Sequence, residues 1–231
     1  MGSDLGRRGF LGVAGAAMAA GVAAAAEAPE PAKGIKILGV SCSPRKGKTT
    51  AAGLQVCLDA AKAVSPNVEV ELLDLGGLNI NGCLAAGVPL PAGQEDDFLK
   101  VAPKLADAKV AGIIVGSPVY FGSMSSLCKA FLDRLMVFRK NSFALSNRVA
   151  GTLAVGGARN GGQELVVQSI QTALLCQEMV IVGDGRPSGR IGATLLNNGK
   201  DDISEDEFGL GTAKNLGRRV AEVALRLAAG K

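Results

Sequence analysis

The sequence predicts an α/β fold in which a five-stranded parallel sheet is covered by helices on both faces. Two observations lead to this prediction. From Ile35 onward, short apolar runs alternate with segments whose apolar residues recur at helical spacing. The chain also contains 32 glycines, which suits a fold with many tight strand-to-helix turns. Strands that alternate with helices are joined by right-handed crossovers, so the sheet is expected to be parallel.

The strands differ in how their side chains alternate, and this predicts their order. In residues 68–72, valine and leucine alternate with glutamate, which is typical of an edge strand. Residues 110–115 are apolar throughout, which indicates a strand buried on both faces. With the second strand at the edge, the expected order is 2-1-3-4-5. The predicted strands are residues 35–40, 68–72, 110–115, 149–155 and 179–182.

The helices are predicted from apolar residues spaced three and four apart. No internal repeat and no second domain are seen, so residues 35–231 are expected to form one domain. The predicted helix faces are Leu54, Cys57, Leu58 and Ala61; Phe98, Val101, Ala102 and Leu105; Met124, Leu127, Cys128, Phe131 and Leu135; Leu165, Val166, Ile170, Ala173 and Leu174; and Ala213, Leu216, Val220, Val223 and Leu227.

The first residues differ in composition from the rest of the chain. Arg7 and Arg8 precede a stretch rich in glycine and alanine that ends near Ala26, and no charged residue interrupts that stretch. The stretch is short and weakly apolar for a membrane span. We expect residues 1–26 to be a twin-arginine signal peptide, residues 27–34 to be a linker, and the mature protein to be periplasmic without a stable membrane anchor. An uncleaved N-terminal helix or membrane anchor is the alternative.

Composition excludes several classes of function. The net charge is +4, the basic residues are scattered and only 3% of residues are aromatic, which argues against nucleic-acid binding. The chain has no histidine, so any histidine-based triad or metal site is excluded. None of the five cysteines has C-x-x-C spacing. Three are expected to be buried on helices, namely Cys57, Cys128 and Cys176, whereas Cys42 and Cys83 lie in loops and are either reactive or paired.

The predicted strand order places a ligand site beyond the carboxyl ends of the first and third strands. The loop after the first strand joins hydroxyls and bases to a helix N-terminus, where backbone N–H groups favour anions. The alternative is a plain helix cap with solvated basic side chains. The candidate phosphate-binding residues of this loop are Ser43, Arg45, Lys48, Thr49 and Thr50.

The same loop admits a second interpretation. Gly47-Lys48-Thr49 is similar to the end of a Walker A loop, but Cys42 stands where that motif needs glycine. The third and fourth predicted strands also end without the carboxylate that would help to hold Mg²⁺. A P-loop-like nucleotidase is therefore the weaker alternative.

Two further loops lie at the same predicted edge. The loop after the third strand contains the only tyrosine of the chain, beside a phenylalanine, and offers a wall for a flat apolar ring. The loop after the fourth strand is rich in glycine, which lets backbone approach a ligand closely, although a flexible turn is the alternative. The candidate residues are Pro118, Val119, Tyr120, Phe121, Gly122 and Ser123 in the first loop, and Gly157, Ala158, Arg159, Asn160, Gly161 and Gly162 in the second.

Three segments resemble one known family. They are Ser43-Pro44-Arg45-Lys46-Gly47 with Thr50, GSPVYFGSMSSLCKAFLDR from Gly116 to Arg134, and GGARNGGQE from Gly156. They resemble the branch of the flavodoxin-like superfamily that contains NADPH-dependent FMN reductases and iron–sulfur flavoproteins, over about residues 35–230. The resemblance implies a flavodoxin-like three-layer sandwich that binds FMN non-covalently.

The resemblance also implies roles for the candidate residues. Ser43, Arg45, Thr49 and Thr50 would hold the FMN phosphate, residues 118–123 would border the isoalloxazine ring, and residues 157–162 would close over its other side. The chain departs from the family at Cys42, where glycine is usual, and at Thr49, where asparagine is frequent. Iron–sulfur members carry a compact cysteine cluster after the second strand. Only Cys83 lies in that region here, so FMN is expected without an iron–sulfur cluster.

The resulting functional prediction is an NAD(P)H-dependent FMN reductase or flavin oxidoreductase. The flavin would supply the chemistry, so no catalytic side chain is assigned. Reduced nicotinamide would donate hydride to a quinone, a free flavin or a metal complex. Because the periplasm is not expected to hold nicotinamide, the alternative is an exported FMN electron carrier that serves a redox partner protein. Dimers or tetramers are usual in the resembled family, so a homodimer or homotetramer is expected, although the sequence shows no interface signal.

Overall fold

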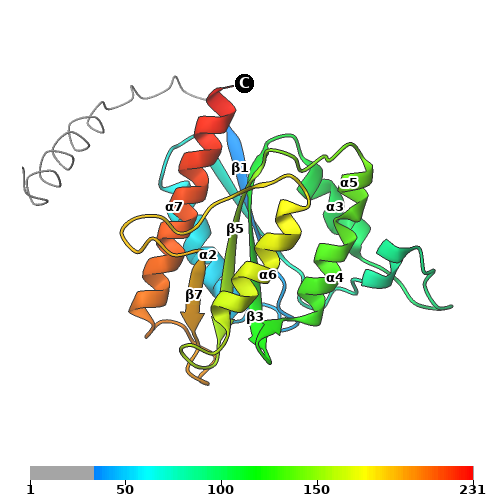
Figure 1. Ribbon diagram of the computed structural model, residues 1–231, viewed down its shortest axis with the longest axis horizontal. Coiled ribbons are helices and arrows are strands. Elements are labelled where there is room, and N and C mark those ends of the chain that lie inside the picture. The colour runs from blue at the N-terminus through cyan, green and yellow to red at the C-terminus, as the bar shows by residue number, and fades with distance from the viewer. Residues whose placement is uncertain (1–33, 231) are drawn as a thin grey trace, which may run out of the picture. The chain divides into compact units, whose positions relative to one another are not determined.

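A parallel sheet forms the centre of the domain in the computed structural model, which describes residues 34–230 (Figure 1). The predicted signal peptide, and the predicted linker up to residue 33, lie outside the described residues. The main strands follow the order β2-β1-β3-β5-β6. This confirms the predicted α/β class and the predicted places of the first four strands. The bounds are β1 Ile35–Ser41, β2 Val68–Asp74, β3 Val110–Tyr120, β5 Val149–Gly156 and β6 Val180–Ile181.

The burial of each strand follows its place in the sheet. β1 pairs with both β2 and β3 in parallel register, and β5 is buried along its whole length. β2 lies at the edge, where Glu69 is exposed and Val68 is buried. The alternating pattern of residues 68–72 therefore predicted this edge strand correctly, because only one of its faces is well covered.

The fifth position of the sheet is shared by two short strands. β6 pairs with the start of β5, at Val149 and Ala150, and β7 (Ala193–Leu196) pairs with its end, from Leu153 to Gly156. Residues 182–192 leave the sheet between them. The prediction of one fifth strand at 179–182 was therefore incomplete. The chain leaves the sheet after β6 and returns to pair with β5 as β7, and the local sequence pattern does not reveal this return.

Helices cover both faces of the sheet in two layers (Figure 1). On one face, α2 (Thr49–Lys62) packs against α7 (Glu207–Ala229). They approach closely at Gly217, where an added Cβ would overlap the carbonyl oxygen of Cys57. The other face is covered by α3 (Phe98–Ala106), α4 (Ser126–Arg134) and α6 (Gln163–Leu175), with the short helices η1 (Gly82–Ala86) and α5 (Met136–Lys140) at the periphery. No helix of the described domain is both long and apolar enough to span a membrane.

The segment predicted as a loop after the third strand is mostly strand. β3 continues through Pro118 and Val119 to Tyr120, and it pairs in antiparallel fashion with β4 (Ser123–Met124). Only Phe121 and Gly122 form the turn, and both have positive φ, 50° and 72°. Two such residues between antiparallel strands are the signature of a type I′ hairpin turn. The loop prediction for residues 116–124 was wrong because this hairpin lacks the usual Asn-Gly sequence.

Two predictions about the helices also need correction. Met124 was placed on the third predicted helix but lies in β4, because Ser125 caps the helix through its hydroxyl, which accepts from Cys128 N. Cys176 was expected to be buried but is exposed at the end of α6. Cys57 and Cys128 are buried as predicted, Cys42 is also buried, and Cys83 is exposed. All five cysteines are free thiols.

Candidate functional site

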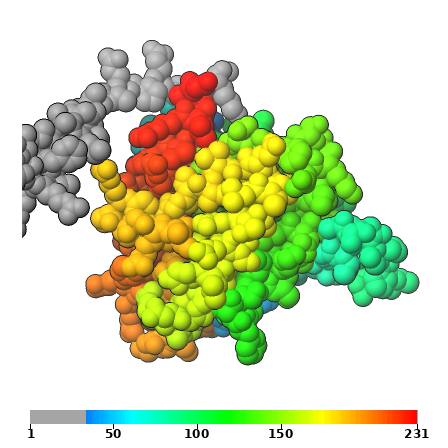
Figure 2. Space-filling model, in the orientation of Figure 1, coloured from blue at the N-terminus to red at the C-terminus, as the bar shows by residue number. Residues whose placement is uncertain are grey.

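The loops that follow β1, β3 and β5 meet at the carboxyl edge of the sheet, as the predicted topology requires. Hydrogen bonds tie the first two together: Cys42 N donates to Gly116 O at 2.8 Å, and Ser125 Oγ donates to Cys42 O at 2.6 Å. In Figure 2 the green hairpin tip, the yellow-green loop after β5 and the orange segment after β7 lie along one edge of the molecule. The three predicted loops therefore form one region of the surface.

Residues 42–48, which we call the phosphate loop, end at an uncapped helix. Lys48 occupies the N-cap position of α2 without a side-chain cap, and the first intrahelical bond is Ala52 N to Lys48 O, 3.0 Å. Within the described residues, the N–H groups of Thr49 and Thr50 have no acceptor and their hydroxyls have no hydrogen-bond partner. Free N–H groups and hydroxyls at a helix N-terminus are the donors that a phosphate needs.

Asp74 holds this loop in place, and sequence reasoning missed it. Its carboxylate accepts from Gly47 N at 2.7 Å and from Gly76 N at 3.0 Å. Gly76 in turn lies against the loop backbone, because an added Cβ would lie 2.6 Å from the Cα of Lys46. Asp74 is the last residue of β2, the strand beside β1. It could have been identified from its position at the carboxyl end of a parallel strand, as the other loops were.

The cysteine that replaces the usual glycine does not obstruct the phosphate loop. The Cys42 side chain is buried in the core cluster that also contains Cys128. Burial, reinforced by the neighbouring Cys128 thiol, raises the pKa of the Cys42 thiol well above its usual value. Cys42 is therefore an inert thiol whose side chain packs in the core.

The two basic side chains of the phosphate loop turn to a carboxylate from another segment. Arg45 Nη1 lies 2.6 Å from Asp201 Oδ1, and Lys48 Nζ lies 3.6 Å from Asp201 Oδ2. Ser43 stays within the loop, where its buried hydroxyl accepts from Arg45 N at 3.2 Å. The structure therefore brings Ser43, Thr49 and Thr50 together in one loop with their hydroxyl and backbone N–H groups. Arg45 and Lys48 instead pair with Asp201.

The hairpin carries the exposed aromatic residues that the sequence predicted. Pro118 is buried in β3, and Val119 is partly buried against the core. Tyr120 is half-exposed, and Phe121 at the turn is fully exposed with φ of 50°. A bulky residue rarely adopts this conformation, and strain of this kind concentrates at functional sites.

The glycine-rich loop after β5 reaches the hairpin with one end only. Gly162 lies against Gly122, and Gln163 braces the loop by donating to Ala158 O at 2.7 Å and accepting from Gly161 N at 2.9 Å. Arg159 turns away and pairs with the carboxylate of Asp206 at the start of α7. Of the residues predicted here, Gly162 contacts the hairpin, and Arg159 has a structural contact instead. Gly157, Ala158, Asn160 and Gly161 are exposed.

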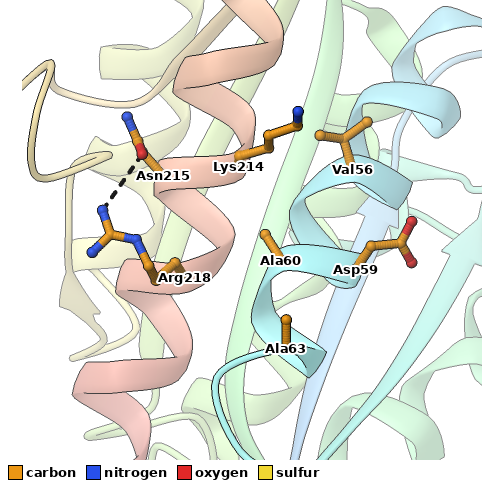
Figure 3. Close-up of a pocket in the computed structure, with 7 residues that line it drawn as sticks. All are labelled: Val56, Asp59, Ala60, Ala63, Lys214, Asn215 and Arg218. Atoms are coloured by element: carbon orange, nitrogen blue, oxygen red, sulfur yellow. Dashed lines mark hydrogen bonds between the residues drawn. The ribbon is translucent and has the colours of Figure 1, made fainter.

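A groove of about 410 Å³ lies elsewhere, between α2 and α7 (Figure 3). It is lined by Val56, Asp59, Ala60, Ala63, Lys214, Asn215 and Arg218. None of the predicted site residues lines it, so it is separate from the carboxyl-edge site.

Comparison with known proteins decides the family. The sequence pattern of the NADPH-dependent FMN reductases matches residues 35–190. The chain belongs to this family. An iron–sulfur flavoprotein of Methanocaldococcus jannaschii is 37% identical over 192 residues, which cover 82% of this chain and 97% of the relative. An NAD(P)H dehydrogenase (quinone) of Paracoccus denitrificans is 33% identical over 154 residues, which cover 60% of this chain and 73% of the relative.

Solved structures support the same fold. A flavodoxin, WrbA-like protein from Agrobacterium tumefaciens superposes with a TM-score of 0.55 at 18% identity, covering 83% of this chain and 98% of that chain. The fold is therefore flavodoxin-like, as predicted from the resemblance. As a member of the NADPH-dependent FMN reductase family, this FMN reductase homologue is a flavin-dependent oxidoreductase, and the nucleotidase alternative has no support.

Proposed function

We propose that this FMN reductase homologue binds FMN non-covalently at the carboxyl edge of its sheet. The observation that carries the proposal is the uncapped N-terminus of α2, where the N–H groups and hydroxyls of Thr49 and Thr50 lack partners within the described domain. Ser43, 2% exposed, lines the same loop. These donors suit the terminal phosphate of FMN, and charge-assisted hydrogen bonds of this kind are strong.

The isoalloxazine ring would lie between the hairpin and the loop after β5. Tyr120 and Phe121 offer exposed aromatic surface on one side, and Gly162 at the end of the other loop contacts that hairpin. FMN, when bound, supplies hydride and electron transfer. The chain contributes binding, exclusion of water by the aromatic side chains and the electrostatic setting of the ring. No histidine or other acid–base side chain is needed for this chemistry.

The substrates proposed are reduced nicotinamide as donor and a small acceptor, namely a quinone, a free flavin or a metal complex. Family membership supports a nicotinamide donor. A homodimer or homotetramer is proposed as the working assembly, with no nucleic acid as partner and no stable membrane anchor.

We propose that the flavin acts without an iron–sulfur cluster, although several relatives are named iron–sulfur flavoproteins. Cys83 is the one cysteine between β2 and α3. The described residues contain no group of three or more cysteine, histidine or acidic side chains suited to a metal ion. Iron analysis of the purified protein tests this: iron in stoichiometric amount with the protein contradicts the proposal.

We also propose that residues 1–26 direct export by the twin-arginine route to the periplasm. The paired arginines and the alanine-rich stretch support this. N-terminal sequencing of periplasmic material tests it, and a retained Met1 contradicts it. Export favours the second candidate function, an FMN electron carrier for a protein partner. NADPH oxidation by the mature protein supports the reductase, whereas flavin binding without NADPH oxidation with any acceptor supports the carrier.

The binding proposal is tested by titrating the apoprotein with FMN and with riboflavin, which lacks the phosphate. Thr49→Val and Thr50→Val keep the side-chain shape and remove the hydroxyl. Each is expected to weaken FMN binding by about tenfold, the effect of one lost hydrogen bond to a charged group, and to leave riboflavin binding unchanged. Thr172→Val is the matched control, because within the described domain its hydroxyl donates a hydrogen bond to Gln168 O on α6 and to no other group. Failure of the unmodified protein to bind either flavin at micromolar concentration contradicts the proposal.

A further inference from the structure

The segment between β7 and α7, residues 197–206, reaches the phosphate loop. One carboxylate of this segment, that of Asp201, pairs with both Arg45 and Lys48 of the loop. Asp201 lies 2.6 Å from the Arg45 guanidinium and 3.6 Å from the Lys48 ammonium. In the described residues, neither Arg45 nor Lys48 pairs with another carboxylate. The Asp201 carboxylate is 37% exposed, so it stays accessible to water and can exchange with another anion.

The ends of this segment are fixed, so the position of Asp201 is a property of the fold. Asp206 accepts from Leu196 N at 2.7 Å and from Gly209 N at 3.0 Å, and it pairs with Arg159. At the other end, Asn197 N donates to Gly156 O, at the end of β5, at 3.0 Å. Between these anchors Asp201 has a φ of 59°, a left-handed conformation that non-glycine residues adopt only where the surroundings impose it.

We infer that the Asp201 carboxylate competes with the cofactor phosphate for Arg45 and Lys48. The inference rests on the proposed function and describes how the same site is regulated. The cofactor phosphate and the Asp201 carboxylate are both anions, and both suit the same two cations. Binding of the phosphate therefore displaces Asp201 or places two anions side by side, and either outcome lowers the affinity for FMN.

Such competition acts on the phosphate and not on the ring. A flavin without phosphate leaves the ion pairs of Asp201 intact, so its affinity does not depend on the carboxylate. Asp201 thus narrows the difference in affinity between FMN and riboflavin that the phosphate loop creates. It also makes FMN release easier than the loop alone would allow.

The test is a pair of titrations, FMN and riboflavin, followed by quenching of flavin fluorescence in full-length apoprotein. Asp201→Asn removes the charge and keeps the shape. It is expected to lower the Kd for FMN by about three- to tenfold, the effect of freeing Arg45 and Lys48 from their partly exposed ion pairs with Asp201, and to leave the Kd for riboflavin unchanged. Asp201→Glu keeps the charge and is expected to retain the unmodified Kd for FMN to within about twofold.

Two further variants separate local competition from a general effect of charge. Glu205→Gln removes a negative charge from the same segment, but Glu205 pairs with Lys200, at 3.0 Å, and with no other base among residues 34–230. It is expected to change the FMN Kd by less than about twofold, because the charge is exposed and screened. In an Arg45→Gln background, Asp201→Asn is expected to lose most of its effect, since the main cation of the competition is gone.

Each outcome bears on the inference. Equal shifts for FMN and riboflavin in Asp201→Asn would show a structural role and overturn it. Weaker FMN binding in Asp201→Asn would show that the carboxylate orients Arg45 for the phosphate, which also overturns it, as does an equally large gain in Glu205→Gln. Normal FMN binding with no effect of Asp201→Asn refutes the inference alone, whereas absence of binding to both flavins in every variant refutes the proposed function and the inference together.

Discussion

Gly162 lies so close to Gly122 that a Cβ added to Gly162 would sit 3.0 Å from the Cα of Gly122. The two glycines belong to the loop after β5 and to the turn of the β3–β4 hairpin, which are 40 positions apart in the sequence. Their contact brings together the two walls proposed for the flavin ring. It depends on Gly162 lacking a side chain, and Gly162 also has a φ of 102°.

Gly162→Ala is therefore expected to lower the free energy of unfolding by about 1–3 kcal/mol, because the residue cannot keep a positive φ without strain. It should also weaken FMN binding by separating the loop from the hairpin. Urea unfolding and FMN titration measure the two effects. Gly157→Ala in the same loop is the control, since its added Cβ has no neighbour nearer than 3.9 Å. Equal tolerance of both substitutions would show that the contact is unimportant.

Phe121 combines full exposure with a φ of 50° at the first turn position. Type I′ turns favour asparagine at this place, followed by glycine, and Gly122 already follows. Phe121→Asn is expected to raise the free energy of unfolding by about 0.5–1 kcal/mol through relief of backbone strain. The same variant should bind flavin more weakly, because the aromatic surface is lost. A variant that is more stable and binds FMN as tightly as the unmodified protein would exclude Phe121 from the ring site.

Arg134 and Asp96 form a buried ion pair. It connects the end of α4, where Arg134 lies, to the segment that precedes α3 and contains Asp96. The side chains are 10% and 7% exposed, and the Arg134 guanidinium also donates to Asn81 O at 3.2 Å and stacks on Phe98 at 4.6 Å. Removal of one partner leaves a buried charge without compensation. Arg134→Met is thus expected to cost about 3 kcal/mol in urea unfolding, and the Arg134→Met, Asp96→Asn double variant should recover part of it. If the double variant is as unstable as the sum of the single variants, the two side chains are not coupled.

Much of this architecture follows from local patterns. Alternation in residues 68–72 located the edge strand, and the continuous apolar run of residues 110–115 located the centre, because burial of one face or both determines the period of the pattern. Strand order then placed the phosphate loop at the helix N-terminus that the structure shows to be uncapped. Ser43, Thr49 and Thr50 were predicted as phosphate-binding residues in this way.

The features that could not be predicted from the sequence depend on contacts between segments that are far apart in the chain. β7 is only four residues long and is defined by its pairing with β5, so its sequence carries little signal. Asp201 meets Arg45 across 156 positions of sequence, and Arg159 turns from the predicted site to Asp206. The hairpin was mistaken for a loop because Phe121 occupies a position that turn statistics reserve for asparagine or glycine.

The cysteines differ sharply in accessibility, which gives a direct check of the fold. Cys83 and Cys176 are exposed, whereas Cys42, Cys57 and Cys128 are fully buried. Two thiols per chain should react with a thiol reagent such as 5,5′-dithiobis(2-nitrobenzoate) within minutes at pH 8, and three more should react only after denaturation. The Cys83→Ser, Cys176→Ser double variant should show no rapid reaction. Rapid modification of Cys42 would contradict its burial beneath the phosphate loop.

Burial of Cys57 also makes stability depend on alkaline pH. Desolvation raises the pKa of this thiol in the folded protein above its ordinary value of 9.0. The unfolded chain therefore releases this proton at a pH where the folded chain retains it. The stabilising contribution is complete below pH 9 and declines as pH rises above it, by about 1.4 kcal/mol per pH unit for one thiol. Cys57→Ala should flatten the decline in the free energy of unfolding between about pH 9 and pH 10.5, compared with Cys83→Ala, whose exposed thiol serves as the control. Identical slopes for the two variants would show that Cys57 is not protected from ionisation in the folded protein.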